Sequence, residues 1–197
     1  KTPLEVAKHP NMDWIAREGI TGWAHTIPSG FPPGSDVGCM SVFGYDPRKY
    51  YTGRAPLEAA AQGIKLDPNE VAFRCNTVTI ENDVMKDYSA GHIESAESAQ
   101  LIKAVNEQLG KDGIRFYSGV SYRHLAVVES GKWKVESQEL AKTKCTPPHD
   151  ISGKSIAPYA PKGPGAERLG ELLCKAAWIL KDHPVNQRRM AQGKPPA

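Results

Sequence analysis

The amino-acid sequence predicts an α/β protein. Residues 95–109 and 166–181 have the apolar spacing of amphipathic helices, with apolar side chains recurring every three or four positions. Residues 70–81 and 123–129 instead alternate β-branched and other apolar residues with polar ones, as strands do. Helices and strands therefore mix along the chain, which is the pattern of an α/β fold.

The N-terminal part is predicted to hold short helices and one strand. Thr2 followed by Pro3 is typical of a helix start, with Thr2 as the cap. Residues 10–19 form a second short helix closed by glycine. Residues 20–27 are expected to form a strand, and residues 54–62 a further helix.

The rest of the chain supplies most of the predicted sheet. The expected strands are listed here in chain order: 70–81, 83–88, 115–120, 123–129 and, as a continuation of the sheet, 133–135. Gly131 and Lys132 are expected in a hairpin turn between the last two. Residues 145–164 are rich in Pro, Gly and Ser and predict an ordered loop, whereas the helix over 166–181 should stop before Pro184.

Composition narrows the class of protein. The chain has 197 residues, 40% hydrophobic and 24% charged, which are ordinary globular values. The formal charge of +3 is too small, and the cations too scattered, to indicate nucleic-acid binding. No apolar run approaches membrane-spanning length, and no signal sequence is recognisable. The cysteines Cys39, Cys75, Cys145 and Cys174 lack paired spacing, so we interpret them as reduced thiols of a cytosolic protein.

The stretch 31–37, Phe-Pro-Pro-Gly-Ser-Asp-Val, carries the main candidate for chemistry. Its prolines and glycine make a stiff, tight approach to a mostly apolar run, and Ser35 and Asp36 have the composition of a helix N-cap. A serine there lies beside unpaired N–H groups at the positive end of a helix, which suits a phosphate or phosphoseryl group. The alternative is that Ser35 or Asp36 only caps a core helix.

This stretch is one of several ordered blocks with a family resemblance. The blocks span residues 25–28, 31–37, 44–47, 50–54, 56–60, 72–76, 87–92, 120–124, 149–154 and 183–186. In this order they resemble the archaeal-type cofactor-independent phosphoglycerate mutases of the alkaline phosphatase superfamily, some of which have carried a homoserine kinase label. The resemblance extends over nearly the whole chain.

The resemblance implies a domain organisation. Residues 1–51 would be partial segments of an alkaline-phosphatase-like core with the nucleophile loop, and residues 52–182 an inserted mixed α/β substrate-binding domain. Residues 183–197 would return to the core. The chain is accordingly expected to be the central piece of a longer protein, inactive by itself.

The resemblance also implies an activity. It assigns Ser35 as the nucleophile that carries the phosphoryl group, as phosphoserine, between the hydroxyls of 3-phosphoglycerate and 2-phosphoglycerate in glycolysis and gluconeogenesis. Ser35 would also bind one of a pair of divalent metal ions, with manganese expected and the other ligands outside this chain.

A substrate clamp is expected from the other matching blocks. Arginine suits it because the guanidinium fork binds phosphate or carboxylate through two parallel hydrogen bonds, although a solvated ion pair is the usual alternative. The candidate substrate-binding residues are Arg54, Arg74, Lys86, Asp87, His92, Arg123, His149 and Lys154. Strand alternation places Arg123 and His124 on opposite faces, and we favour Arg123 as the functional member.

The expected partner is a small phosphorylated substrate, with no nucleic acid and no membrane, in the cytoplasm. One alternative is a related phosphohydrolase or phosphotransferase acting on another small hydroxy acid, including the homoserine kinase activity. The lack of a nucleotide-phosphate loop in the sequence argues against a kinase. Another alternative is a non-catalytic binding module in which Ser35 only caps a helix.

Overall fold

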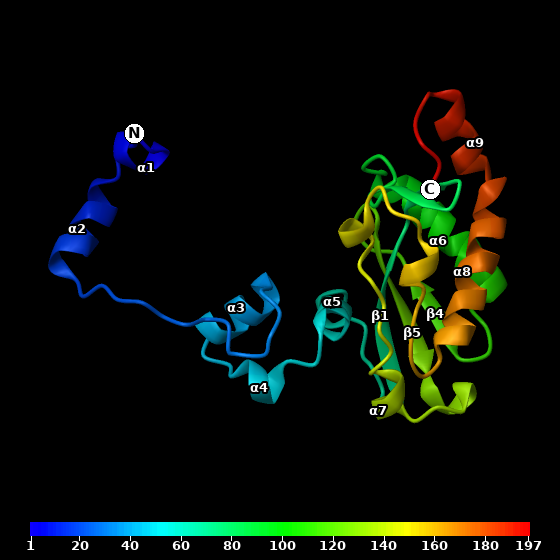
Figure 1. Cartoon of the computed structure of the whole chain (residues 1–197), viewed down its shortest axis with the longest axis horizontal. Coiled ribbons are helices and arrows are strands. Elements are labelled where there is room, and N and C mark those ends of the chain that lie inside the picture. Colours follow the sequence, from blue (N-terminus) through cyan, green and yellow to red (C-terminus); the bar gives the residue numbers. More distant parts are fainter. The chain divides into compact units, whose positions relative to one another are not determined.

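A computed structural model describes all residues of the chain, 1–197 (Figure 1). The chain divides into two compact units, residues 1–52 (unit 1) and residues 53–197 (unit 2). It contains no helix that is both long enough and apolar enough to cross a membrane. The mixed α/β class predicted from the sequence is confirmed, and its strands all lie in unit 2.

Unit 1 consists of short helices joined by irregular chain: α1 (Pro3–Val6), α2 (Pro10–Glu18), α3 (Ser35–Val42) and α4 (Pro47–Tyr50). Proline lies in the first turn of α1, α2 and α4, where its missing N–H removes no helical hydrogen bond. The predicted cap Thr2 is confirmed. Its side chain accepts from the N–H of Glu5, and its own N–H donates to the Glu5 carboxylate, which makes a capping box.

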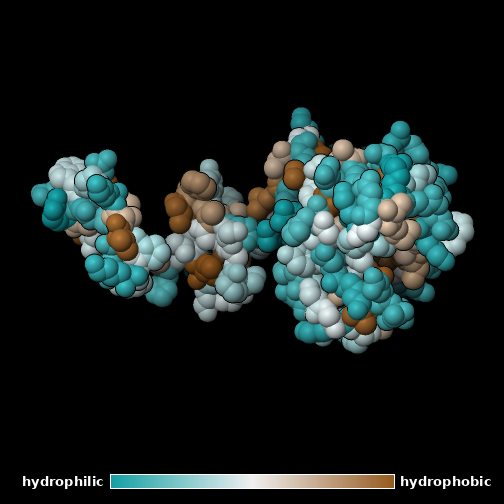
Figure 2. Space-filling model, turned by 90° about the horizontal axis from the view of Figure 1, so that it is seen from above, coloured by the Kyte–Doolittle hydropathy of each residue, from teal (hydrophilic) through white to brown (hydrophobic).

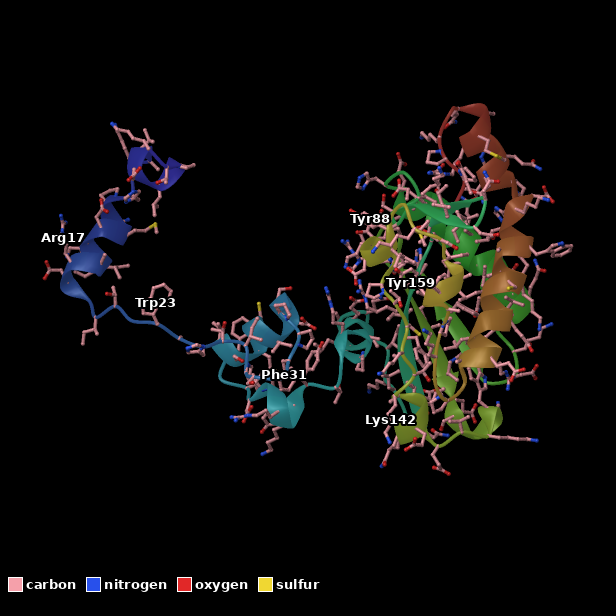
Figure 3. The ribbon with its side chains drawn as sticks, viewed as in Figure 1. Arg17, Trp23, Phe31, Tyr88, Lys142 and Tyr159 are labelled. Atoms are coloured by element: carbon pink, nitrogen blue, oxygen red, sulfur yellow. The ribbon has the colours of Figure 1, made fainter.

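The strand predicted over residues 20–27 is wrong. This stretch is irregular, and Ile20 and Trp23 are fully exposed in it. Figure 3 shows the Trp23 side chain on an extended part of the chain that precedes α3. A strand needs a neighbour for its backbone N–H and C=O groups, and unit 1 contains no strand that could pair with this one. Its apolar residues alone do not produce the predicted strand.

Unit 2 is organised around an antiparallel three-stranded sheet in the order β1 (Glu70–Asn76), β5 (Arg123–Glu129), β4 (Ile114–Tyr117). The central strand β5 pairs Ala126 with Phe73 of β1 on one side and with Phe116 of β4 on the other. A separate ribbon pairs β2 (Thr79–Glu81) with β3 (Val84–Asp87). The prediction of β5 is confirmed to the residue.

The helices of unit 2 cover both faces of the sheet. They are α5 (Arg54–Ala61), α6 (Ser95–Leu109), α7 (Ser137–Leu140), α8 (Ala166–Lys181) and α9 (Pro184–Ala191), with the short 3-10 helices η1 (Ser130–Trp133), η2 (Pro148–Ile151) and η3 (Ala157–Tyr159). One face of β5 carries Leu125 and Val127 and is covered by α5. The other carries Ala126 and Val128 and is covered by Trp133, α7 and α8. Figure 1 shows α6 and α8 side by side, and their residues are in contact.

Several predicted strands of unit 2 differ from the structure. The strand expected over 70–81 is broken after Asn76, and β2 starts a separate ribbon at Thr79. The strand expected over 133–135 is wrong, because Trp133 ends η1 with its ring buried and Lys134 has a left-handed φ of 56°. A left-handed residue turns the chain away from the extended path of a strand. The hairpin turn expected at Gly131 and Lys132 is replaced by the same η1 turn.

The C-terminal segment packs on unit 2. The amide of Asn186 in α9 donates to the carbonyl of Ala197 at 2.5 Å and accepts from its N–H at 2.9 Å. The hydroxyl of Thr79 donates to the carbonyl of Pro196 at 2.6 Å. Segment 193–197 is therefore tied both to α9 and to β2. The return of residues 183–197 to the alkaline-phosphatase-like core remains a prediction.

The surfaces of the two units differ in character. On the face of unit 2 seen in Figure 2, hydrophilic residues dominate and hydrophobic ones form scattered spots. Unit 1 exposes large apolar side chains, among them Trp14, Trp23, Val42 and Phe43. Unit 1 therefore buries little of its own apolar surface.

Candidate functional site

Ser35 is the first residue of α3, and Gly34 is its N-cap. The capping interpretation of Ser35 is therefore wrong: glycine occupies the cap position and no side chain caps the helix there. The Ser35 side chain is exposed, whereas Val37, two residues on, is completely buried and anchors the helix. The first turn of α3 thus presents its N–H groups and an exposed hydroxyl together.

Gly34 is needed for this arrangement. A Cβ at this position would lie 2.2 Å from Oδ1 of Asp36, so any other residue would displace that carboxylate. Asp36 is held from a different direction, because the hydroxyl of Tyr51 donates to its Oδ2 at 2.5 Å. The Tyr51 ring in turn packs edge to face on the Phe31 ring, with 6.0 Å between the ring centroids (Figure 3 labels Phe31). This contact links the stretch 31–34 before α3 to the residue that follows α4. Tyr51 thereby joins the first turn of α3 to the proline-rich stretch before it.

An open pocket of about 410 Å³ adjoins the start of α3. Its lining comes from the stretch between Thr26 and Phe43 and includes Ser35, Gly38 and Cys39. The lining is mainly apolar, so it offers little charge to a phosphoryl group. Phosphoryl transfer needs cations near the transferred group, and this pocket does not supply them.

The residues of this chain do not fit a complete metal site. Nowhere along residues 1–197 do three His, Cys, Asp or Glu side chains gather closely enough to hold a metal ion. A divalent metal in a protein normally takes several such ligands, and a lone serine hydroxyl does not replace them. Any metal ion at Ser35 would therefore need ligands from outside this chain.

In unit 2 an aromatic and cationic cluster brings together two of the predicted residues, Arg123 and His149. The Arg123 guanidinium carbon lies 4.6 Å from the Tyr122 ring centroid, and its Nη2 donates to the Tyr122 hydroxyl at 2.7 Å. The Tyr122 ring meets Tyr88 edge to face at 5.7 Å, and Tyr88 meets the His149 ring at 6.1 Å. We call Tyr88, Tyr122, Arg123 and His149 the tyrosine cluster (Figure 3 labels Tyr88). It is a surface of aromatic rings edged by two groups that can bind anions.

The loop that follows β3 adjoins the tyrosine cluster through Tyr88. Its Asp87 carboxylate accepts hydrogen bonds of 2.7 Å from the N–H and hydroxyl of Ser89 and from the N–H of Gly91. Burial acts to raise the pKa of Asp87, but these hydrogen bonds outweigh it and hold the pKa below its ordinary value. Asp87 thus stays ionised and shapes the loop, and His92 is exposed at the loop's far end.

The other candidates lie apart from one another or have protein partners. Nε of Arg74 lies 3.0 Å from Oε1 of Glu58 on α5, an ion pair too poorly aligned for a good hydrogen bond. Lys86 is exposed and 4.0 Å from a carboxylate oxygen of Glu81. Lys154 donates to the carbonyl of Asp150, and its ammonium lies 5.9 Å from the Tyr159 ring. Arg54 is exposed at the first position of α5, directly after Gly53 with its φ of 105°.

Arg123 and His124 lie on opposite faces of β5, as predicted: Arg123 is exposed and His124 is 1% exposed. Nδ1 of His124 accepts from the N–H of Gly119 at 3.1 Å, so the ring proton is on Nε2, which faces the Thr77 hydroxyl at 3.4 Å. Burial lowers the pKa of His124 to about 4. The imidazole is therefore neutral and structural at physiological pH.

Sequence reasoning missed three residues that shape these sites. Tyr88 and Tyr122 lie inside blocks already recognised, and for Tyr122 the neighbouring Arg123 was an available signal. Arg189 carried no signal, because its partners are far away in the sequence. Ser35 belongs to unit 1, and all the other candidates belong to unit 2.

Comparison with known proteins identifies a family that matches most of the chain. The family described as 2,3-bisphosphoglycerate-independent phosphoglycerate mutase matches residues 16–186. The protein of that name from Methanosarcina barkeri is 50% identical over 197 residues, which are the whole of this chain and 48% of that protein. A probable enzyme of the same name from Geobacter sulfurreducens is 51% identical over 201 residues, with the same coverage. The chain thus spans about half the length of these relatives.

Two solved structures are similar to the chain along its whole length. A cofactor-independent phosphoglycerate mutase from Thermoplasma acidophilum has a TM-score of 0.61 and 32% identity, and the match covers 51% of it. A protein from Pyrococcus horikoshii has a TM-score of 0.67 and 30% identity, and the match covers 43% of it.

Proposed function

This chain belongs to the 2,3-bisphosphoglycerate-independent phosphoglycerate mutase family, and we propose that it supplies the nucleophile and part of the substrate clamp of such an enzyme. The whole enzyme would interconvert 3-phosphoglycerate and 2-phosphoglycerate, with Ser35 as the temporary carrier of the phosphoryl group. The observation that carries the proposal is the exposed Ser35 hydroxyl at the start of α3, next to a glycine cap.

The proposed reaction has two transfers. In the first, Ser35 Oγ attacks the phosphorus, loses its proton, and the bond from phosphorus to O3 of the glycerate breaks as O3 gains a proton. In the second, O2 of the glycerate attacks the phosphorus of the phosphoserine and loses its proton, and the bond from phosphorus to Ser35 Oγ breaks as Oγ regains a proton. The first-turn N–H groups of α3 favour the negative phosphoryl group at this position.

The glycerate must be retained while it changes the hydroxyl that it presents. We assign this task to unit 2, with Arg123 and His149 of the tyrosine cluster as the principal contacts and His92, Lys154, Lys86, Arg54 and Arg74 as further candidates. Arg123 is favoured because its guanidinium is exposed and is oriented by Tyr122. Asp87 is proposed to act through the shape of its loop, since its carboxylate is occupied within that loop.

Metal dependence is part of the proposal for the whole enzyme. A pair of divalent ions, expected to be manganese, would supply the positive charge that the apolar pocket lacks. Because this chain brings together no cluster of metal-binding side chains, the 197-residue chain alone should be inactive. The whole enzyme is expected in the cytoplasm.

The experiment is a mutase assay of the full-length gene product and its Ser35→Ala variant, with Ser41→Ala on the same helix as the control. Loss of turnover in Ser35→Ala alone supports the proposal, and substantial residual turnover refutes it. Parallel assays with phosphoserine, and with ATP plus homoserine, measure the competing phosphotransferase activities.

A further inference from the structure

Arg189 of α9 is the most deeply buried charged side chain in unit 2, with 1% of its surface exposed. All three of its guanidinium nitrogens have partners. Nη1 binds the Glu97 carboxylate of α6 at 2.5 Å, Nη2 donates to the carbonyl of Ala90 at 2.5 Å, and Nε donates to the carbonyl of Pro195 at 3.0 Å. A buried guanidinium needs such complete pairing, because an unpaired charge there is very costly.

These contacts join segments that are far apart in the sequence. Glu97 and Ala90 lie 92 and 99 positions from Arg189, and Pro195 belongs to the C-terminal segment 193–197. The loop and that segment also touch directly, since a Cβ on Gly91 would lie 2.7 Å from Cγ of Pro195. One side chain therefore fastens the loop after β3 to α6, α9 and the C-terminal segment.

The loop of residues 87–92 that Arg189 holds has an unfavourable backbone conformation. Ala90, Gly91 and His92 have φ angles of 49°, 65° and 50°, so two residues with side chains lie in the left-handed region that they rarely adopt. Such conformations persist when surrounding contacts enforce them, and they concentrate at functional sites. Asp87 enforces this one from inside the loop, and Arg189 enforces it from outside.

We propose that Arg189 is a positioning residue that holds the 87–92 loop in its left-handed form and so sets the place of His92 at the end of this loop, which adjoins the tyrosine cluster through Tyr88. The consequence for catalysis rests on the proposed function, in which this loop contacts the phosphorylated substrate. Arg189 itself is buried, so it acts on substrate only through the loop that it holds. Its effect is on substrate affinity rather than on the chemistry at Ser35.

The test is made on the full-length protein with Arg189→Lys. Lysine keeps the charge opposite Glu97 but lacks the fork that reaches two carbonyls at once. Arg188→Lys is the matched control, because Arg188 is exposed on the same helix. The first readout is amide hydrogen exchange of the 87–93 peptide by mass spectrometry, which follows the N–H of Gly91 bonded to Asp87.

In Arg189→Lys the loop amides should exchange about tenfold faster, since a hydrogen bond to a charged group is lost, and Arg188→Lys should match the unaltered protein. The KM for 3-phosphoglycerate should rise about tenfold with kcat within about twofold, because uniform substrate binding is lost and transition-state contacts are not. Unaltered exchange overturns the inference. Faster exchange with an unaltered KM also overturns the inference, since the conformation of the loop would then have no effect on substrate binding.

A second variant and the activity of the unaltered protein complete the test. If Arg189→Lys does not fold, Pro195→Ala removes the contact with Gly91 from the other side and should raise exchange and KM in the same direction. Mutase activity of the unaltered protein is measured first. If the unaltered protein has no mutase activity, the proposed function is refuted. The amide hydrogen exchange of the 87–92 loop then decides by itself whether Arg189 holds this loop.

Discussion

The hydroxyl of Tyr51 donates a hydrogen bond of 2.5 Å to the carboxylate of Asp36, the residue that follows Ser35. The negative charge of Asp36 lies one residue from the proposed phosphoryl site, where its direction affects how strongly it repels an incoming phosphate. Tyr51 directs that carboxylate toward its own hydroxyl. The orientation of an aromatic side chain at the end of unit 1 therefore bears on the electrostatics of Ser35.

Replacing Tyr51 by Phe should slow the mutase reaction of the full-length protein. Loss of one hydrogen bond to the carboxylate is worth about 1 kcal/mol, which corresponds to about a fivefold lower kcat. Tyr50→Phe is the control, because Tyr50 contacts Tyr45 and Lys49 through its ring rather than through its hydroxyl. A kcat unchanged in Tyr51→Phe would show that the carboxylate has no influence on the transfer.

His124 should make the stability of unit 2 depend on pH. Burial lowers its pKa to about 4 from the ordinary 6.5, so between these values the unfolded chain binds a proton that the folded chain does not. This contribution to stability is complete above the unfolded pKa and is lost as the pH falls toward the folded pKa. The free energy of unfolding should therefore fall by about 2 kcal/mol from His124 alone between about pH 7.5 and about pH 5.

Urea unfolding of the chain and its His124→Asn variant at both pH values measures this contribution, which the variant should lack. Leu125→Ala is the control: it leaves a cavity on the face of β5 opposite His124, costs about 2–5 kcal/mol, and should lower stability equally at both pH values. An identical pH dependence in the chain and in His124→Asn would contradict the assignment of a neutral buried imidazole.

Arg123→Gln should weaken substrate binding without affecting the fold. The side chain is exposed, so its removal costs a charged contact with the substrate and, within the protein, only its surface contact with Tyr122. The KM for 3-phosphoglycerate should rise about tenfold or more, with an unchanged melting temperature. Arg115→Gln is the comparison, because Arg115 is also exposed but pairs with Glu70. Equal KM values for the two variants would remove Arg123 from the clamp.

The left-handed loop makes a prediction about Gly91. Gly91→Ala combines a disfavoured φ of 65° with a Cβ 2.7 Å from Pro195, and should lower the free energy of unfolding by about 2–3 kcal/mol. Gly153→Ala has a similar φ of 77° and open space around its Cβ, so it should cost about 1 kcal/mol. Urea unfolding gives both values. Equal decreases in the free energy of unfolding for the two variants would mean that Pro195 moves away from the added Cβ without an energetic cost.

The elements predicted correctly are those whose signals are local. The bounds of α6 and α8 followed from apolar periodicity together with Gly110 after one helix and Pro184 beyond the other. The α1 cap followed from Thr2 and Pro3 in the same way. The strand expected over 20–27 failed because a strand depends on a partner, which no local pattern reveals.

The candidate site was predictable to a similar extent. The exposed Ser35 at the start of a helix followed from the Pro-Pro-Gly approach, although Gly34 rather than Ser35 is the cap. The tyrosine cluster and Arg189 depend on contacts between distant segments, as in the pair of Arg189 with Glu97, 92 positions apart. Such contacts are set by the tertiary fold and leave no pattern in a single sequence.

The most direct test of the central claim is to find the phosphoryl group on Ser35. The full-length protein is mixed with 3-phosphoglycerate, quenched in acid during turnover and digested, and the peptide that contains residues 31–42 is analysed by mass spectrometry. We predict a phosphorylated peptide with the modification on Ser35, present in the unaltered protein and in Ser41→Ala and absent from Ser35→Ala. Turnover without any phosphorylated form of this peptide, or with the phosphoryl group on another residue, would contradict the account.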